Sequence, residues 1–503
     1  MFMDERLLEQ LWTELDGPSS ALAAVSFSGP ARGLPSVYEV SELASATVGL
    51  ATLAVAELHA LRTGQGLRAV HVDRAHADAA FLCERHLRAL GWQLPEVWDP
   101  LAGDYLTRDG FIRLHTNYSY HRDAVLRVLS LAAASVTREQ LAALVASWDG
   151  EPLEAAVVAA GGCAAKLRSP AEWRAHPQGQ ALASAPLFEL TVSPAPGAPR
   201  AGLLEAPRAG ALSSSDRDRA RDPRQVGAAV GAEWSTELSA RSTLEMPLAG
   251  VRVLDLTRVI AGPIGTRFLA AYGADVLRVD PPGFEEVGAL LCEVTAGKRR
   301  CALQLREPAD RERFLELVRA ADVIVHGYRG DALERLGLSN DVLRQHNPNA
   351  VIVCHNAYGW TGPWAARRGF DSLVQMSCGI AWRGREVTGK ERPVPLPAQA
   401  LDHGTGYLIA AAAARGLTRR AQTGQASVTR LSLARTAQLL MELGDLGAIA
   451  GTAQQPSAAV LEEADTALGR VQRVRCPGGV EGIEPEWAIP AGPLGSDPPR
   501  FQI

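Results

Sequence analysis

Residues 251–280 read VRVLDLTRVIAGPIGTRFLAAYGADVLRVD, and this stretch decides the fold. It predicts a strand at 251–256, a Gly/Pro turn at 261–263, a helix at 264–272 and a second strand at 275–279. The same order continues along the chain, with apolar strands expected at 302–305, 323–326 and 351–354 and helices at 308–320, 331–336 and 341–346.

Short strands alternate with helices throughout this part of the chain. That alternation predicts an α/β fold with a Rossmann-like, doubly wound parallel sheet. Because the crossovers of such a sheet are right-handed, a ligand is expected at the carboxyl ends of its strands.

The usual nucleotide-binding motifs do not occur in this sequence. The turn after the first strand reads TRVIAGPIG instead of GxGxxG, with Pro263 where phosphates need a close backbone approach. The Gly-Lys pairs at 297–298 and 389–390 lack the upstream glycine and the following Ser or Thr of a phosphate-binding loop. There is also no GxSxG motif, so an α/β-hydrolase is not indicated.

The composition is that of a globular protein. The 503 residues are 47% hydrophobic and 21% charged, and the formal net charge of −5 gives no reason to expect nucleic acid as a partner. The seven cysteines are scattered without a CxxC pair, which predicts reduced, buried thiols and no metal site.

Targeting signals are also missing from the sequence. No apolar run reaches the ~18–20 residues of a membrane span, and the nearest, at 407–414, is about half that length. The N-terminus, MFMDERLLEQLW, lacks the basic-then-apolar order of a signal peptide. We therefore expect a cytoplasmic protein with no membrane partner.

Residues 1–191 form a separate, smaller α+β segment in this interpretation. Its longest element is an Ala/Leu-rich helix at 40–62, which is followed by a strand at 69–73. Asp109-Gly110 lies between two apolar runs and is the strongest hairpin signal in the chain. Three helices are expected after it, at 120–135, 137–148 and 151–160.

Residues 192–245 are rich in Pro, Gly, Ser and alternating charges. They predict a flexible linker between the N-terminal segment and a second domain at 246–503.

An internal repeat connects the two halves. Glu42–Gly66 aligns with Asp402–Ala426 without a gap. Each copy starts with an acidic residue, continues as an Ala-rich helix and ends in Thr-Gly-Gln. The helix with an acidic residue near its start is thus predicted to be present twice.

The second half resembles the class III CoA-transferase family, which includes formyl-CoA transferase, carnitine CoA-transferase and α-methylacyl-CoA racemase. The resemblance covers roughly 246–440. The motifs that carry it, in the family's order, are PLAGVRVLDLTRVIAGPIG (247–265), GKRRCALQL (297–305), ADVIVHGYRGDALERLGL (321–338), NAYGWTGPW (356–364), RGFDSLVQMSCGIA (368–381) and LDHGTGYLIAAAAARGLTRRAQTGQ (401–425).

This resemblance implies an acyl-CoA:carboxylate CoA-transferase with Asp402 as the nucleophile. An acyl-CoA and a carboxylic acid are the implied substrates, with no metal and no permanently bound cofactor. From spacing alone the favoured interpretation of Asp402 is a helix N-cap, and the surrounding motif reverses this preference. The positions that match the family's CoA contacts are Arg258, Val259, Ile260, Ala261, Lys298, Leu303, Tyr328, Arg335, Leu336 and Arg368.

Three positions depart from the family pattern. Ile260 stands where formyl-CoA transferase has a Gln, and Gly327 replaces an Asn. The racemase branch needs a His-Asp pair, which here is Phe370-Asp371, and phenylalanine cannot carry a proton. A racemase-like enzyme and a non-catalytic CoA-binding homologue remain the alternatives.

The N-terminal half resembles the family's acidic helix and small domain, so the family's segments look permuted and partly duplicated. Glu42 is interpreted as structural, because no strand-turn-helix CoA motif precedes it. Since the family's protomers interlock, residues 1–190 are predicted to dock on 246–503 as an intrachain pseudo-dimer, and a homodimer stays possible.

Overall fold

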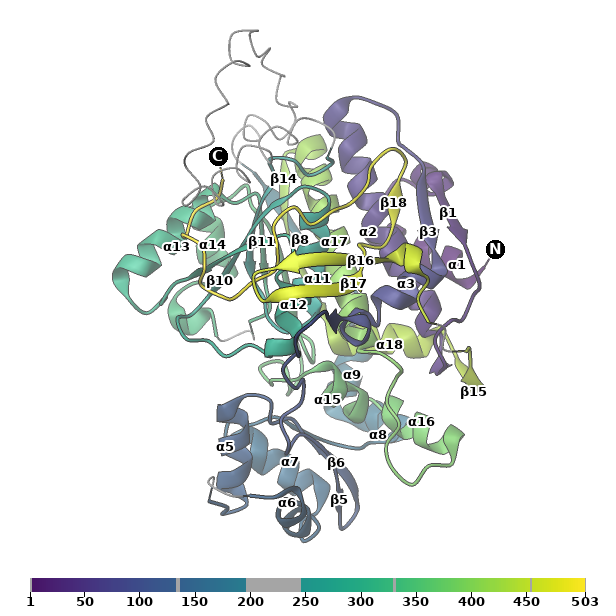
Figure 1. Ribbon diagram of the computed structural model, residues 1–503, viewed down its shortest axis with the longest axis vertical. Coiled ribbons are helices and arrows are strands. Elements are labelled where there is room, and N and C mark those ends of the chain that lie inside the picture. Colours follow the sequence, from purple (N-terminus) through teal and green to yellow (C-terminus); the bar gives the residue numbers. More distant parts are fainter. Residues whose placement is uncertain (1, 133–135, 196–245, 329–331, 453–454, 503) are drawn as a thin grey trace.

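A computed structural model describes residues 2–132, 136–195, 246–328, 332–452 and 455–502 (Figure 1). Most of the predicted linker, residues 196–245, therefore lies outside the described residues. The large α/β body contains both the N-terminal and the C-terminal parts of the chain, and a small α+β lobe lies at one end of it (Figure 1).

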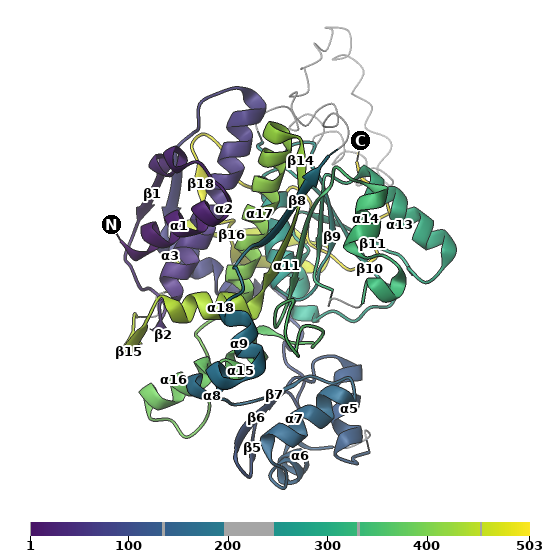
Figure 2. The same cartoon turned by 180° about the vertical axis from the view of Figure 1, so that it is seen from behind.

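A seven-stranded sheet forms the centre of the large body. All neighbouring strands are parallel except the edge strand β8, which is antiparallel to β14 (Figure 2). The fold class expected from the alternation of strands and helices is confirmed at this level. The strand order is β11 (Lys298–Ala302), β10 (Asp275–Asp280), β9 (Arg252–Leu256), β12 (Val323–His326), β13 (Val351–Asn356), β14 (Gln425–Ser432) and β8 (Glu189–Pro194).

Three predicted boundaries were wrong. The third strand occupies 298–302 instead of 302–305, because its cationic side chains pair with carboxylates and so tolerate burial. The helix expected at 331–336 is a 3₁₀ turn, η4 (Glu334–Leu336). Residues 192–194, predicted as linker, belong to β8, which places part of the N-terminal half in the central sheet.

Helices cover both faces of this sheet. One face packs on α13 (Pro308–Ala320) and α14 (Asn340–His346), whose apolar residues form one core cluster with it. The other face packs on α11 (Ala261–Ala271), α17 (Ala400–Thr423) and, beyond them, α2 (Val40–Thr63), all in one larger cluster.

The helices α2 and α17 are closely matched copies. Both have 24 residues, their N-cap residues share φ −75°, and both end at a glycine with φ near 67–68°. Such positive φ values suit glycine, which explains the repeated Thr-Gly-Gln at their ends. The two helices pack directly on each other, and a buried Arg415–Glu57 ion pair (2.5 Å) crosses their interface.

The N-terminal half contacts the C-terminal half through further elements, and their arrangement as an intrachain pseudo-dimer stays a prediction. Each long helix is followed by a strand and a shorter helix, α3 (Arg74–Ala80) after α2 and α18 (Leu433–Glu442) after α17. The C-terminal tail returns to the N-terminal half, where β18 (Gly479–Val480) pairs with β3 (Val70–Asp73).

The small lobe contains the predicted hairpin, which is confirmed. The strands β5 (Gly103–Thr107) and β6 (Gly110–Leu114) are antiparallel, and β7 (Ala164–Lys166) extends their sheet. The lobe has its own apolar core. Its helices are α5 (Ser119–Val128), α6 (Arg138–Val145) and α7 (Gly150–Ala159).

Shorter elements join the lobe and the N-terminal half to the body. They are α1 (Met3–Glu14), η1 (Ser19–Ala24), β1 (Val25–Ser28), β2 (Ser36–Tyr38), α4 (Cys83–His86), β4 (Arg88–Ala89), α8 (Pro170–Ala175), α9 (Pro177–Ala183), η3 (Gly288–Leu290), α12 (Leu291–Val294), α15 (Asp371–Ser377), α16 (Ile380–Thr388), β15 (Asp445–Ala450), η5 (Ala458–Val460), β16 (Leu461–Thr466) and β17 (Gly469–Val474).

Helix α2 has the length and mean hydropathy (1.4) of a membrane span, although polar residues interrupt its apolar sequence. In this fold 89% of its most apolar window is buried, against α17 and neighbouring elements. Its apolar surface is thus already covered within the chain.

Candidate active site

A cavity of about 320 Å³ opens at the carboxyl ends of β9 to β12, where the sheet topology places a ligand. Five of the ten predicted CoA contacts lie on its wall. Its lining residues are Leu256, Arg258, Val279, Asp280, Pro281, Leu303, Gln304, Leu305, Arg306, Tyr328, Ala332, Arg335 and Leu336.

Arg258 is held at the cavity by two aromatic rings. Its guanidinium carbon lies 4.0 Å from the ring centre of Phe284 and 5.5 Å from that of Tyr328. Its Nη2 donates to the Tyr328 hydroxyl at 3.4 Å, and its Nε lies 3.7 Å from Asp280 Oδ1. A half-exposed cation beside a planar ring suits both a phosphate and an adenine.

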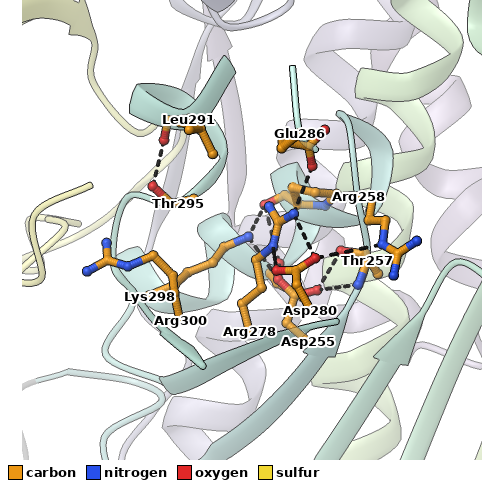
Figure 3. Close-up of polar contacts among 12 residues, drawn as sticks. Asp255, Thr257, Arg258, Arg278, Asp280, Glu286, Leu291, Thr295, Lys298 and Arg300 are labelled. Carbon is orange, nitrogen blue, oxygen red and sulfur yellow. Dashed lines mark hydrogen bonds and ion pairs between the residues drawn. The ribbon is translucent and has the colours of Figure 1, made fainter. Parts of the chain in front are cut away.

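Lys298 does not line this cavity, and its expected contact with a CoA phosphate is corrected. Its Nζ donates to Asp255 Oδ2 at 2.9 Å and to the Pro263 carbonyl at 3.0 Å, in a fully buried position (Figure 3). Burial lowers the pKa of Lys298 to about 8, although Asp255 opposes this shift. Its ammonium therefore fixes the start of α11 to the end of β9.

The same ionic network reaches the loop after β9. Arg278 donates to Asp280 and Glu286, both at 2.8 Å (Figure 3). Glu286 also accepts the Val259 N–H at 3.3 Å. Val259 has φ +66°, a strained conformation for a β-branched residue that costs roughly 1–3 kcal/mol. The carboxylate of Glu286 offsets part of that cost.

Ala261 lies beside α17, and Val259 and Ile260 directly precede it in the chain. A Cβ on Gly265 would come within 2.6 Å of the Gly406 carbonyl, and one on Gly406 within 2.7 Å of the Ala261 carbonyl. The backbones of α11 and α17 are therefore in contact. Because Gly406 is about one turn after Asp402, this contact brings the start of α11 close to Asp402.

Asp402 is in the first turn of α17 and is 7% exposed. Burial raises its pKa well above the usual value, and the charges of Asp371 and Glu84 add to this shift. Among the residues that the structure describes, none donates a hydrogen bond to its carboxylate. The N-cap interpretation of Asp402 does not hold, since the cap is Gln399.

Asp371 supplies the missing cap from a different helix. Its Oδ2 accepts the backbone N–H groups of Leu401 at 2.8 Å and Asp402 at 3.1 Å, and its Oδ1 accepts from Gln375. Burial raises the pKa of Asp371 to about 6. The geometry agrees with the structural role expected for Asp371.

Phe370 stands where the racemase branch has a histidine, and its ring is packed against other aromatic side chains. Its ring stacks on His115 with centres 3.7 Å apart and planes 1° apart, and it also contacts Tyr118. Burial lowers the pKa of His115 and His121 to about 3, so both imidazoles are neutral near pH 7. The arrangement disfavours proton transfer of the racemase type.

Arg368, in the loop before α15, contacts the small lobe and is not among the residues that line the cavity. Its Nη1 donates to the Gly161 carbonyl at 2.7 Å, and its guanidinium lies 5.7 Å from the Tyr120 ring centre. Its expected role in CoA binding is therefore not supported by this geometry.

The departure at Gly327 has a steric reason. A Cβ at this position would lie 2.7 Å from His355 Nε2, so His355 occupies the space that an Asn side chain would need. A glycine at position 327 therefore fits beside His355, whereas an Asn side chain would collide with it.

Glu42, the counterpart of Asp402, is covered by α1. The Asp4 side chain of α1 is buried in an ion pair with Arg74 at 2.7 Å, and both charges act on the Glu42 carboxyl. Burial raises the pKa of Glu42. The two copies of the acidic helix therefore have different surroundings.

Sequence reasoning missed several residues of this region. Tyr118 of the small lobe donates to Glu286 at 3.1 Å, and Glu84 of α4 bonds His403 at 3.0 Å. These contacts join positions more than 160 residues apart, and no local pattern indicates them.

The fold and the site define a class of protein. It has a parallel sheet whose carboxyl edge holds a cation–aromatic cavity, next to a long helix with a buried carboxyl in its first turn. Residues 248–477 match the family model described as CoA-transferase family III. This match confirms the resemblance that the motifs of the second half indicate.

Several proteins that are similar to this chain are named as CoA-transferases. The chain is 36% identical over 208 residues to "Acetyl-coenzyme A transferase nodX" of Hypoxylon pulicicidum, covering 41% of this chain and 35% of that protein. It is 31% identical to "Probable fatty acyl-CoA transferase Rv3272" of Mycobacterium tuberculosis (37% and 50%) and to "Succinyl-CoA:glutarate CoA-transferase" of Mus musculus (36% and 43%). The chain thus spans half or less of the length of these relatives.

Two solved structures are also similar. The orthorhombic crystal structure of Rv3272 from M. tuberculosis is 30% identical, with a TM-score of 0.34 over 39% of this chain and 60% of that one. A CAIB/BAIF family protein from Brucella suis is 25% identical, with a TM-score of 0.34 over 45% and 65%.

Proposed function

We propose that this protein is an acyl-CoA:carboxylate CoA-transferase with Asp402 as its nucleophile. The observation that supports this most directly is the carboxyl of Asp402 itself. It is buried in the first turn of α17, none of the described residues donates a hydrogen bond to its carboxylate, and it lies near the strained loop after β9. A carboxylate that serves only as a cap or a salt bridge has donors.

The cavity is the proposed site for the nucleotide end of CoA. Arg258 and Arg335 supply positive charge for its phosphates, and Tyr328 supplies a ring for its adenine. Leu303 and Leu336 line the apolar part of the wall. The pantetheine arm then runs along the start of α11, past Val259–Ala261, to reach Asp402.

The proposed reaction has two halves. Asp402 attacks the thioester carbonyl carbon, a carbon–oxygen bond forms, and the carbon–sulfur bond breaks so that CoA leaves as a thiolate. The thiolate then attacks the aspartyl carbonyl carbon of the mixed anhydride and releases the donor acid as a carboxylate. This leaves an aspartyl-CoA thioester.

The acceptor carboxylate completes the cycle by the reverse steps. It attacks the aspartyl carbonyl, expels the CoA thiolate and forms a second anhydride. The thiolate attacks the acyl carbon of this anhydride, which yields the new acyl-CoA and returns Asp402 as a carboxylate. Every step exchanges a carboxylate and a thiolate, so no net proton transfer is needed.

The surroundings of Asp402 suit this chemistry. A buried carboxylate with a raised pKa is more basic and therefore a stronger nucleophile once it is ionised. The α17 N-terminus provides an opposing, stabilising field for the same charge. Acylation removes the charge and relieves the repulsion from Asp371 and Glu84.

Trapping the acyl-enzyme tests the proposal. We expect hydroxylamine, added during incubation with a panel that includes acetyl-CoA, succinyl-CoA and a long-chain acyl-CoA, to leave a hydroxamate at Asp402, detected by peptide mass spectrometry. An unmodified Asp402 with every thioester, together with measurable CoA binding, would instead identify a non-catalytic CoA-binding protein.

Arg335→Ala is expected to weaken acyl-CoA binding about tenfold while turnover changes less than about twofold, because the side chain binds ground and transition states equally. Calorimetric titration with CoA and steady-state kinetics measure the two effects. Arg344→Ala, at a partly exposed arginine of α14 that does not line the cavity, is the matched control. Equal CoA affinity in the two variants would rule out the proposed phosphate contact.

A further inference from the structure

A buried Glu–His pair next to Asp402 joins the two halves of the chain. Glu84 Oε2 lies 3.0 Å from His403 Nε2, and His403, the neighbour of Asp402 on α17, is fully buried. Phe81 stacks on the imidazole with ring centres 5.3 Å apart. Glu84 and Phe81 come from the N-terminal half, 319 residues or more before His403.

The charge of Glu84 also reaches the nucleophile. Burial would raise the pKa of Glu84, but the charge and hydrogen bond of His403 outweigh this effect and lower it. Glu84 is therefore a carboxylate near pH 7. The same charge contributes to the raised pKa of Asp402.

Binding of a metal ion by Cys83, Glu84 and His403 is the alternative to a Glu–His pair. Cys83 Sγ, a Glu84 oxygen and a His403 nitrogen lie within 4.8 Å of one another. The Arg267 guanidinium donates to Cys83 Sγ at 3.7 Å, which brings a positive charge to the position of a cation. Burial also raises the pKa of Cys83 to about 12, so the thiol is neutral and a poor ligand.

We propose that Glu84 is a positioning residue that acts through His403: the pair holds the first turn of α17 and keeps a carboxylate charge beside Asp402. This inference rests on the proposed function. The free Asp402 carboxylate is repelled by Glu84, whereas the acylated Asp402 is neutral and is not. The pair thereby favours acylation, and the N-terminal half completes the active site.

The ionisable groups around Asp402 determine the expected pH dependence. Asp371 from α15 and Glu84 from α4 act on Asp402 directly, and Cys83, His403 and Arg267 surround Glu84. Among them Glu84 and Asp371 raise the pKa of Asp402. Removing the charge of Glu84 lowers this pKa, so the acidic limb of the turnover profile moves to lower pH.

Glu84→Gln keeps a hydrogen-bonding side chain but loses the charge. We expect turnover to fall about tenfold at unchanged KM for acyl-CoA, with the acidic limb displaced to lower pH. Glu84→Asp is expected to restore the limb to the wild-type position. Turnover as a function of pH and the rate of hydroxylamine trapping at Asp402 are measured for each variant.

The matched control is Glu57→Gln, at another buried glutamate of the N-terminal half, which pairs with Arg415 away from the first turn of α17. It is expected to lower the melting temperature without moving the acidic limb. His403→Gln provides a second variant, and the double variant is expected to be no slower than either single one, since the residues act as a unit.

The experiments distinguish failure of the proposed function from failure of the positioning role of Glu84. If the wild-type protein forms no adduct at Asp402, the proposed function fails. If the adduct forms but Glu84→Gln keeps the wild-type turnover and acidic limb, the positioning role is wrong. A limb that moves equally in Glu84→Gln and Glu57→Gln would also overturn it, because the effect would then be a general loss of packing.

Discussion

Asp402→Asn is expected to lower CoA transfer at least ~10³-fold, because an amide keeps the shape of the carboxyl but is a poor nucleophile. Affinity for CoA is expected to stay within about twofold, since the cavity that carries Arg258 and Arg335 does not include Asp402. The variant should also fold, because Asp371 caps the helix through backbone N–H groups alone. Transfer assays and calorimetric titration with CoA measure both quantities.

The chain contains a matched control for this substitution. Glu42→Gln makes the same kind of change at the same position of the paired helix, where α1 covers the carboxyl. We expect transfer within about twofold of the wild type. Comparable losses in both variants would mean that the two acidic helices share the chemistry, and full activity of Asp402→Asn would refute the proposed mechanism.

The sheet was predictable because its strands are short apolar runs bounded by glycine or by helices. The alternation in 251–280 requires a parallel crossover, and the crossover places the cavity at the carboxyl edge. The strand at 298–302 was misplaced because KRRC looks exposed as a sequence. Only the tertiary fold shows that Asp255, Asp275 and Asp497 neutralise these cations.

A residue of the candidate site was predictable only where a single motif indicates both its place in the site and its reactive or binding side chain. Asp402, Arg258 and Tyr328 are of this kind. Lys298 matched a motif but is buried in an ion pair, which a motif cannot show. Glu84 is in the N-terminal half and Tyr118 in the small lobe, so their contacts with the family domain depend on how distant segments pack.

Cutting the chain at Ser214, within residues 196–245, is expected to leave the two fragments bound to each other. The N-terminal fragment keeps β8 in the central sheet and α2 against α17, and the C-terminal fragment keeps β18 on β3. Each fully buried Leu or Val side chain of α2 contributes roughly 1.5–3 kcal/mol, so separation would expose a large apolar surface. Gel filtration after cleavage at an inserted protease site is the measurement.

A charge reversal at the α2–α17 interface tests whether this interface holds the two fragments together. Glu57→Lys places two cations together at the α2–α17 interface, since Arg415 is buried there. The loss of a buried partner alone costs about 3–5 kcal/mol, and repulsion adds to it, so the cleaved variant is expected to dissociate or aggregate. Glu9→Lys makes the same charge change at an exposed position of α1 and is expected to leave the complex intact. Wild-type fragments that separate as two folded, soluble proteins would refute the intrachain pseudo-dimer, because α2 and α17 would then each be stable without the other.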